Sequence, residues 1–422
     1  MSLQEILKQV RANPNGMNAM AFYAHIPFCR FMCHYCDFAK TANFTSDLLA
    51  RYMVALNVHA QTWLRVAEEW DRIPVFSSVF FGGGTPSLLG LEYVPLMAVL
   101  RPHLAPQAEV TLEANPDDLT EENLNVWRDL GFNRLSIGVQ TFEEVGLSFL
   151  KRTHRSADID AGLSRAARYF DRLNIDLIYG WSGQTWDMWR KDLERAVALP
   201  VDHVSLYHLT YEPKTPIGRA FHRGAIKAAT DDELADFYEF ASDYLASQGF
   251  FAYEVSNWCK PGGYCKQNIN YWSGASYIGV GSGAHGYLAH QGPYGIRYHY
   301  PQRERRLKTG ADSGPHEMTE AGVAAFLGVE IERERGAESW VLERLGSSLR
   351  SVVGFNLSAA EKKLGRLWQS SPAAEEALAQ GKLSFRLIHD DRYLVLHPGQ
   401  WFLEQTWAQV ILEGWQDKAP VP

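Results

Sequence analysis

Three cysteines lie close together in the segment HIPFCRFMCHYCDF, which covers residues 25–38. Cys29, Cys33 and Cys36 are separated by three and then two residues, and no fourth cysteine follows nearby. Thiolates gathered in one short loop are typical ligands of a zinc ion or an iron–sulfur cluster. The spacing therefore predicts a metal site, and the missing fourth cysteine bears on what kind of site it is.

Zinc and an iron–sulfur cluster make different demands on the missing ligand. A structural zinc site needs four ligands, and His25, His34 or a distant cysteine could be the fourth. A [4Fe–4S] cluster held by three cysteines instead leaves one iron without a protein ligand. That iron can then bind a small molecule, so the missing cysteine becomes a functional feature.

The composition describes a globular protein larger than one small domain. The 422 residues, 46% of them hydrophobic and 21% charged, suffice for two or three domains with a buried core. The net charge of −8 disfavours nucleic acid as the main partner, since phosphate binding usually needs a basic face. MSLQEILKQVRANPN lacks the apolar region of a signal peptide, and no stretch approaches the roughly 20 apolar residues of a membrane span. With an odd number of cysteines, these features predict a cytoplasmic protein.

Short apolar runs alternate with helix-like segments over the first two-thirds of the chain. The runs that we predict to be strands cover residues 19–26, 77–83, 108–114, 132–139, 173–180 and 201–209. Nearly continuous apolar strands between helices indicate a parallel sheet buried on both faces. Six right-handed βα units of this kind form an α/β fold, a partial (βα)6 barrel. Ligands bind such barrels at the carboxyl ends of the strands, and the cysteine loop follows the first strand.

The composition also predicts how the chain is divided. We expect an N-terminal extension (1–18), the partial barrel (19–250), a region rich in glycine and aromatic residues with a linker (251–314), and a C-terminal domain (315–422). In the last part, helices precede two strands, KLSFRLI and YLVLHP, which predicts a winged-helix-like α+β domain. Its 11 Lys and Arg against 15 Asp and Glu favour a scaffold or docking unit over a DNA-binding domain.

The cysteine loop after the first barrel strand resembles that of the radical SAM superfamily. In that superfamily the open iron binds the amino and carboxylate groups of S-adenosylmethionine, and an electron from the cluster cleaves it to methionine and a 5′-deoxyadenosyl radical. Further motifs follow in the order of one subfamily: FFGGGTPS (80–87), LEANPDD (112–118), IGVQTF (137–142), LKRTH (150–154) and NIDLIYG (174–180). This subfamily contains the oxygen-independent coproporphyrinogen III oxidases (HemN) and the HemW heme chaperones. The resemblance extends from about residue 20 to the C-terminus.

The resemblance implies roles for individual positions. The three cysteines are expected to bind the [4Fe–4S] cluster. The residues expected to contact S-adenosylmethionine are Tyr23, Tyr35, Gly83, Gly84, Thr85, Glu113, Gln140, Arg152 and Asp176. Among these, Glu113 would hold the methionine amino group, Arg152 would pair with its carboxylate, and Asp176 would bind the ribose hydroxyls. No residue is assigned a catalytic role.

Two features favour the chaperone branch over the oxidase branch. The oxidase has a fourth cysteine where this chain has Phe38, and it has a long N-terminal segment where about 18 residues precede the first predicted strand here. YEVSNWCKPGGYCKQNINYW (253–272) and GVGSGAHG (279–286) are also typical of HemW. The predicted function is therefore that of a HemW-like heme chaperone. The alternatives are a coproporphyrinogen III oxidase, a HemN-like methylase and a zinc-stabilised scaffold.

The resemblance does not identify a heme ligand in this chain. Gln267 stands where the chaperones carry a histidine, and an amide is a poor iron ligand beside imidazole. Nearby candidates are His285, Cys265 and Cys259, although a packed histidine in a glycine-rich turn is the simpler interpretation of His285. The expected partners are heme, heme-acceptor proteins, including those at the cytoplasmic membrane face, and an electron donor such as flavodoxin or ferredoxin. Cleavage of S-adenosylmethionine is expected without oxidase activity, and a homodimer is compatible with the resemblance.

Overall fold

The computed structural model describes residues 19–70, 73–301, 319–333, 336–388 and 390–415. The predicted N-terminal extension lies outside these residues. None of the helices within the described ranges is both long enough and apolar enough to span a bilayer.

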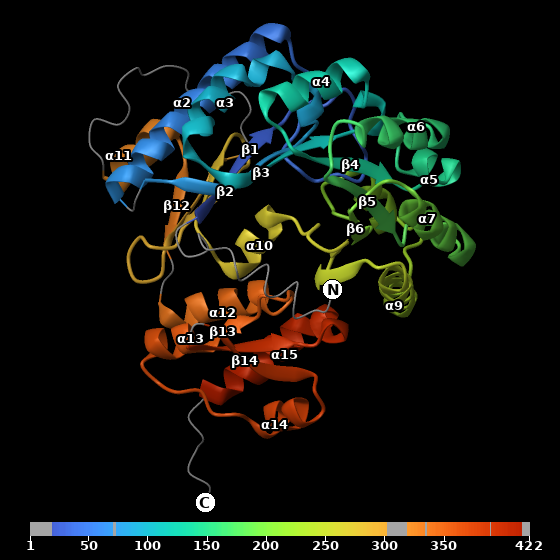
Figure 1. The fold of residues 1–422 in the computed structure, drawn as a ribbon. Helices are drawn as coiled ribbons and strands as arrows, with labels where there is room; N and C mark the ends of the chain where they lie inside the picture. The colour runs from blue at the N-terminus through green and yellow to red at the C-terminus, as the bar shows by residue number, and fades with distance from the viewer. Residues whose placement is uncertain (1–18, 71–72, 302–318, 334–335, 389, 416–422) are drawn as a thin grey trace, which may run out of the picture.

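Six parallel strands form the centre of the fold (Figure 1). They are β1 (Ala19–Ile26), β2 (Val75–Gly83), β3 (Leu104–Ala114), β4 (Arg134–Gln140), β5 (Leu173–Tyr179) and β6 (His203–His208). They lie side by side in sequence order, each parallel to the next. Each of the six overlaps a strand predicted from the apolar runs, with bounds that differ by at most four residues, because strands buried on both faces leave a nearly continuous apolar signal.

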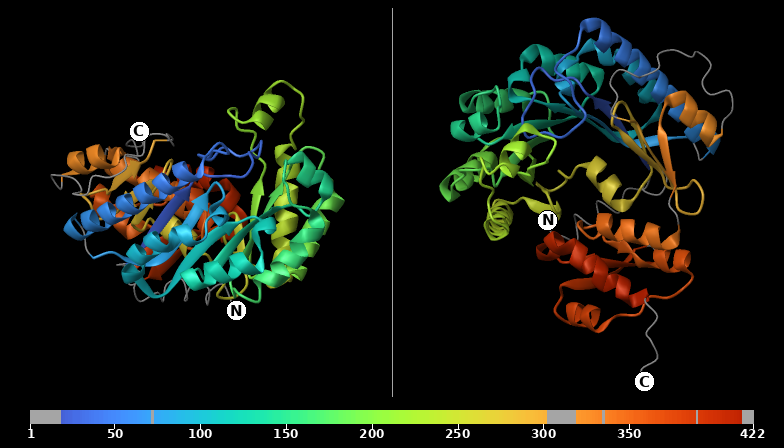
Figure 2. Two further views of the ribbon diagram at one scale, coloured as in Figure 1. Left: turned by 90° about the horizontal axis from the view of Figure 1, so that it is seen from above. Right: turned by 180° about the vertical axis from the view of Figure 1, so that it is seen from behind.

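Helices between these strands cover the convex face of the curved sheet (Figure 2). They are α2 (Ser46–Trp70), α3 (Val94–Leu100), α4 (Glu121–Leu130), α5 (Glu144–Phe149), α6 (Ser156–Ala166) and α7 (Trp186–Ala198). Two more helices follow β6: α8 (Pro216–His222), and α9 (Asp231–Ser247), which packs against α7. Thr120 and Thr185 cap α4 and α7 by accepting a backbone N–H hydrogen bond, and each helix then buries a tryptophan, Trp127 or Trp189. The helices therefore leave the concave face and the strand ends for ligands.

Shorter strands extend the sheet at both edges. On the β6 side are β8 (Asn257–Cys259) and β7 (Phe251–Glu254). On the β1 side are β9 (Tyr277–Val280), β10 (His285–Leu288), β11 (Ile296–His299) and β12 (Glu330–Arg333), which gives a sheet of 12 strands. Helix α10 (Lys266–Ser273) contacts β1 and β2, and α11 (Glu320–Leu327) precedes β12.

The C-terminal residues form a second layer of helices with a small sheet, below the barrel in Figure 1. The elements are α12 (Ala337–Ser348), β13 (Phe355–Asn356), α13 (Leu357–Leu364), α14 (Pro372–Ala379), β14 (Leu383–Ile388), β15 (Asp391–Leu396) and α15 (Glu404–Leu412). Strands β14 and β15 form the hairpin expected from KLSFRLI and YLVLHP. The core of this part is continuous with Tyr253, Cys259 and Cys265 of the barrel, so the two parts are packed together.

Candidate functional site

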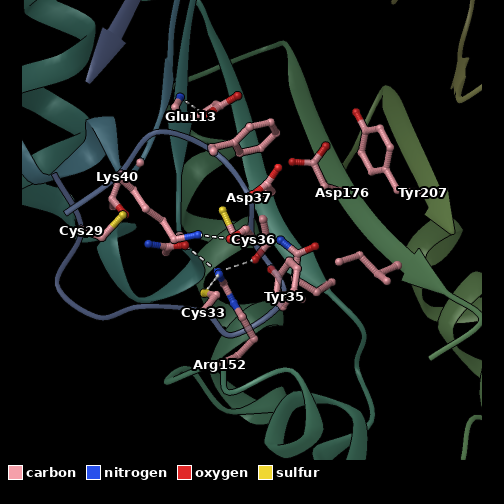
Figure 3. Close-up of a pocket in the computed structure, with 18 of the residues that line it drawn as sticks. Cys29, Cys33, Tyr35, Cys36, Asp37, Lys40, Glu113, Arg152, Asp176 and Tyr207 are labelled. Carbon is pink, nitrogen blue, oxygen red and sulfur yellow. Dashed lines mark hydrogen bonds between the residues drawn. The ribbon is translucent and has the colours of Figure 1, made fainter. Parts of the chain in front are cut away.

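A cavity of about 620 Å³ opens at the carboxyl ends of the parallel strands (Figure 3). The predicted site residues that line it are Cys29, Cys33, Tyr35, Cys36, Gly83, Gly84, Thr85, Glu113, Gln140, Arg152 and Asp176. These residues are far apart in the sequence, and the parallel sheet brings them together because most of them follow or end a strand, while Asp176 lies within β5. Tyr23 is not among the lining residues: its hydroxyl lies 3.1 Å from His25 Nδ1.

Backbone hydrogen bonds hold the cysteine loop in place. The Cys29 N–H donates to the Thr41 carbonyl at 2.9 Å, and the Thr41 N–H donates to Pro27 at 2.7 Å. The Lys40 ammonium donates to the carbonyl oxygen of Cys36. The loop is thus closed on itself at its base, which positions three thiols without help from regular secondary structure.

The glycine motif after β2 supports the same loop. The Gly84 N–H donates to the Ile26 carbonyl and the Thr85 N–H to the Phe28 carbonyl, both at 2.8 Å. A Cβ atom at Gly84 would lie 2.8 Å from each of the Ile26 and Phe28 carbonyl oxygens, so a side chain does not fit there. The motif therefore serves the cavity twice, by lining it and by fixing the cysteine loop.

Two carboxyl groups face the cavity from neighbouring parts of the sheet. Glu113, near the end of β3, accepts a hydrogen bond from the Gly83 N–H at 3.0 Å. Burial raises the pKa of Glu113 to about 7, and the charge of Asp176 adds to the shift. Burial also raises the pKa of Asp176, whose Oδ1 accepts from Asn174 at 2.8 Å. Because both acids resist ionisation alone, a cation placed near them would be bound favourably.

Arg152 links the cysteine loop to the strand ends. Its Nη1 lies 3.4 Å from the sulfur of Cys33, and its Nη2 donates to the Gly138 carbonyl at 2.9 Å and to Asn115 Oδ1. Its Nε atom is buried without a hydrogen-bond partner among the described residues. The guanidinium thus lies beside the Cys33 thiol and is held by protein groups.

Gln140 and Tyr35 occupy constrained positions. Gln140 ends β4 at a register shift and has a φ of 72°, a left-handed conformation that is uncommon for residues other than glycine. Such a conformation costs on the order of 1 kcal/mol and is often found in binding sites. Tyr35 packs against a small apolar cluster that includes Ile178 and Trp181, and this packing anchors the middle of the cysteine loop.

Asp118 is a further residue of the site region that sequence reasoning did not single out. Its carboxylate is buried and accepts hydrogen bonds from the Arg30 guanidinium, the Ser87 hydroxyl and the Asn115 N–H. It therefore connects the cysteine loop, the glycine motif and the turn after β3. The PDD sequence of that turn was the available signal, but adjacent acidic residues usually indicate only a solvated turn.

The candidate heme ligands do not line this cavity. Gln267 is buried, and its amide accepts from the Ser78 hydroxyl and donates to the Tyr271 hydroxyl, both at 2.8 Å. Cys259 and Cys265 are also buried. His285 is exposed at the start of β10. Of these four, only His285 can reach an external ligand without a rearrangement of the core.

Comparisons with known proteins agree with the geometry. The family model described as the radical SAM superfamily matches residues 23–196. Heme chaperone HemW of Mycobacterium tuberculosis is 35% identical over 90% of this chain and 91% of its own length. Heme chaperone HemW of Lactococcus lactis is 38% identical over 65% of this chain and 70% of its own length. The range matched by the family model includes the cysteine loop.

One solved structure is similar over nearly the whole chain. The Escherichia coli radical SAM enzyme coproporphyrinogen III oxidase (HemN) has a TM-score of 0.70 and 20% sequence identity, and the alignment covers 97% of this chain and 93% of that chain. At this identity the likeness concerns the fold alone. It confirms the predicted fold class, an α/β barrel of the radical SAM type.

Proposed function

We propose, from the premise that the chain belongs to the HemW family of the radical SAM superfamily, that it binds a [4Fe–4S] cluster and S-adenosylmethionine and carries heme to acceptor proteins. The observation that carries this proposal is the cavity into which one loop brings three cysteines, with a glycine motif and acidic strand ends around it. The relative from Mycobacterium tuberculosis, named as a heme chaperone, matches over nine-tenths of the chain.

The thiols fit a cluster with one open iron. Cys33 and Cys36 are partly exposed to the cavity, and Cys29 lies at its buried base. Thiolates are the ligands that such clusters require, and three of them leave one iron for S-adenosylmethionine. When bound, the reduced cluster supplies the electron that cleaves this cofactor. The Arg152 guanidinium beside Cys33 would stabilise the negative charge of the thiolate-bound cluster.

The acidic strand ends fit the cationic parts of S-adenosylmethionine. Glu113 lies close to the Gly83 N–H, where an ammonium group could be held between carboxylate and backbone. Asp176 is on β5 at the same edge of the sheet, and its carboxylate can accept hydrogen bonds from ribose hydroxyls. Bound cofactor would thus offset the cost of burying the ionised carboxylates of Glu113 and Asp176, which is the cost that raises their pKa values.

The charge of the cavity favours a heme chaperone over an oxidase. The charged residues that line it are Asp37, Lys40, Glu113, Arg152, Asp176 and Glu212. Both basic residues already donate hydrogen bonds to protein groups. Coproporphyrinogen III carries four carboxylates, and the reacting propionate would have to enter this acidic space. Heme carried as cargo can keep its propionates in solvent.

The partners follow from this function. We propose that the client proteins are heme acceptors, that a flavodoxin- or ferredoxin-like protein reduces the cluster, and that the acidic C-terminal domain (315–422) is a docking unit. The boundaries drawn above for the four parts of the chain belong to the same proposal.

Anaerobic reconstitution followed by two assays on one sample tests the function. We expect iron and sulfide in the ratio of a [4Fe–4S] cluster, an electron paramagnetic resonance signal that changes when S-adenosylmethionine is added, and a Soret band on heme titration. Incubation with coproporphyrinogen III should give no protoporphyrinogen. Zinc without sulfide would reject the cluster, absence of heme binding would reject the chaperone, and porphyrinogen turnover would establish the oxidase instead.

A further inference from the structure

A row of hydrogen-bonded side chains crosses the inside of the barrel, from the cavity to the junction with the C-terminal part. Asn174 Nδ2 lies 2.8 Å from Asp176 Oδ1, and Asn174 Oδ1 lies 2.6 Å from His203 Nδ1. His203 Nε2 in turn lies 2.8 Å from the Tyr253 hydroxyl. We call Asp176, Asn174, His203 and Tyr253 the barrel network. Figure 3 shows Asp176, the member of the network that lines the cavity.

The pairing of β5 with β6 places the network on one face of the sheet. Asn174 and Asp176 are two residues apart on β5, so their side chains share a face, and His203 on β6 pairs with Asn174. Tyr253 is on β7, within the core of the C-terminal part, and its carbonyl accepts a hydrogen bond from the Val352 N–H at 2.9 Å. Asn174, His203 and Tyr253 are each at most 1% exposed, so water does not compete for their hydrogen bonds.

Each hydrogen bond of the network has one direction once Asp176 is ionised. A carboxylate can only accept, so Asn174 presents its amide nitrogen to Asp176 and its oxygen to His203. His203 Nδ1 must therefore carry the ring proton. Burial, followed by the charges of two nearby arginines, lowers the pKa of His203 well below its ordinary value. The ring is thus neutral, and its Nε2 accepts a hydrogen bond from the Tyr253 hydroxyl.

The far end and the middle of the network are held by further hydrogen bonds. The Tyr253 oxygen accepts from Asn268 Nδ2 at 3.2 Å and from the Cys265 N–H at 3.4 Å, which leaves its own proton for His203. The Asn174 amide also bonds serine hydroxyls on β4 and β6, at 2.7 and 3.1 Å. Within the described ranges, none of the buried side-chain polar atoms of the network lacks a hydrogen-bond partner. The network is therefore fully satisfied, and each member fixes the orientation of the next.

We propose that Asn174, His203 and Tyr253 are positioning residues that hold the Asp176 carboxylate in the orientation in which it accepts hydrogen bonds from the ribose of S-adenosylmethionine. This inference rests on the proposed function, in which Asp176 binds that ribose. The hydrogen bond from Asn174 restricts rotation of the carboxylate, so the ribose meets a group that is already oriented.

Tyr253 acts on Asp176 from a distance, through the imidazole. The Tyr253 hydroxyl donates to His203 Nε2 and thereby keeps the ring proton on Nδ1. Without that donor the proton can move to Nε2, and His203 then no longer donates to Asn174. The Asn174 amide would be free to turn its oxygen toward Asp176, where it would repel the carboxylate.

A double-mutant cycle on the anaerobically reconstituted full-length chain tests whether the network acts through Asp176. Tyr253→Phe removes only the hydroxyl and should weaken binding of S-adenosylmethionine about fivefold, the effect of roughly one hydrogen bond. In the Asp176→Asn background the same substitution should leave the affinity unchanged, because the carboxylate that it orients is absent. Calorimetry on the wild type, the two single variants and the double variant gives the four affinities.

Matched variants separate positioning from a general loss of stability. Tyr298 is also only 1% exposed, and its hydroxyl bonds the Gly279 backbone in another part of the sheet, so Tyr298→Phe should lower stability without changing the affinity. His203→Asn keeps an amide donor near the position of Nδ1, whereas His203→Gln places its amide near the position of Nε2. His203→Asn should therefore retain more affinity than His203→Gln.

Nitrogen NMR of the full-length chain labelled at histidine gives a readout that needs no cofactor. The His203 signals, identified by their loss in His203→Asn, should show a proton on Nδ1 and none on Nε2, and Tyr253→Phe should change them. A proton on Nε2 in the wild type, or equal losses of affinity for Tyr253→Phe in both backgrounds, would overturn the proposal. A wild-type chain that bound no S-adenosylmethionine would reject the proposed function instead, and the His203 signals would then decide alone whether the network has the stated direction.

Discussion

The two ends of the barrel bury polar groups in opposite ways. At the carboxyl end, charged and thiol groups line an open cavity of about 620 Å³. At the amino end, Arg134 and Glu109 are only 2% and 4% exposed, and their charged atoms lie 4.0 Å apart. Arg172 lies 3.6 Å from the same carboxylate and 2.7 Å from Asp202. The amino end is thus a buried cluster of opposite charges, although Arg134 Nε and Glu109 Oε2 make no hydrogen bond among the described residues.

Four of the five cysteines show the same contrast, whereas Cys29 is buried although it belongs to the loop, and burial raises the pKa of its thiol. Cys259 and Cys265 lie at the amino end, where burial raises the pKa of each thiol to about 12. Such thiols remain protonated and do not bind metal at neutral pH. Cys33 and Cys36 are in a loop and partly exposed, so a metal could reach them. Position in the fold, more than residue type, separates these two pairs of cysteines.

Replacing one cysteine at each end of the barrel by alanine gives the largest expected difference, which is in the iron and sulfide content of the chain. Cys33→Ala should remove nearly all of the cluster, because a three-cysteine site has no spare protein ligand. Cys265→Ala should keep the cluster and lower the free energy of unfolding by about 1–3 kcal/mol, as expected for loss of buried packing. Iron and sulfide per chain after anaerobic reconstitution measure the first effect, and urea unfolding measures the second.

The same two variants also show which result would contradict this comparison. If Cys265→Ala lost iron to the same extent as Cys33→Ala while remaining folded, the amino-end thiol would take part in metal binding. The distinction drawn between the two ends would then be wrong.

The buried ion pair at the amino end should dominate the charge contribution to stability. Arg134→Met leaves Glu109 buried with only the more distant Arg172, and breaking such a pair typically costs about 3–5 kcal/mol. Arg168→Met removes an exposed pair with Glu121, in which both side chains are over 60% exposed, and should change stability little. Equilibrium unfolding of both variants measures the two changes in the free energy of unfolding. Equal losses in the two variants would contradict the prediction.

Sequence reasoning predicted the parts of the molecule that leave a local signal. The six parallel strands are mostly apolar, and the three cysteines of the loop have a spacing that predicts a metal site. The edge strands β9–β12 are only four residues each and of mixed composition, so their pairing depends on tertiary contacts that the sequence does not display.

The features that could not be predicted from the sequence depend on hydrogen bonds between residues far apart in the chain. Asp118 joins residues 88 and 31 positions away, Arg30 and Ser87, and no local pattern marks such a carboxylate. The buried hydrogen bonds of Gln267 were equally hidden, because one of its partners, Ser78, is 189 positions away. The sequence identified the glutamine as unusual for the family, while only the fold shows that its side chain has a structural partner.

A smaller expected effect is the pH dependence that Glu113 gives to the carboxyl end, in both stability and cofactor affinity. Burial raises its pKa from 4.5 to about 7, so the folded chain holds this proton more tightly than the unfolded chain. Without cofactor, the contribution of Glu113 to stability is therefore greatest at low pH and is lost as pH rises from 4.5 to about 7. Cofactor binding should reverse the trend if, as proposed, the ionised carboxylate holds the ammonium group of S-adenosylmethionine. We expect the affinity for S-adenosylmethionine to rise with pH, by at most about tenfold per unit, up to about 7 and to level off above it.

Measuring that affinity in the wild type and in Glu113→Gln across this range tests the assignment. The amide cannot ionise, so the variant should bind weakly and without this pH dependence. Asp176→Asn provides the control, since its amide removes the second carboxyl group, whose charge helps to raise the pKa of Glu113. In that variant the rise should persist but move to lower pH. A rise that survived unchanged in Glu113→Gln would mean that another group at the carboxyl end takes up the proton, and Glu113 would then belong with the structural carboxylates such as Glu109.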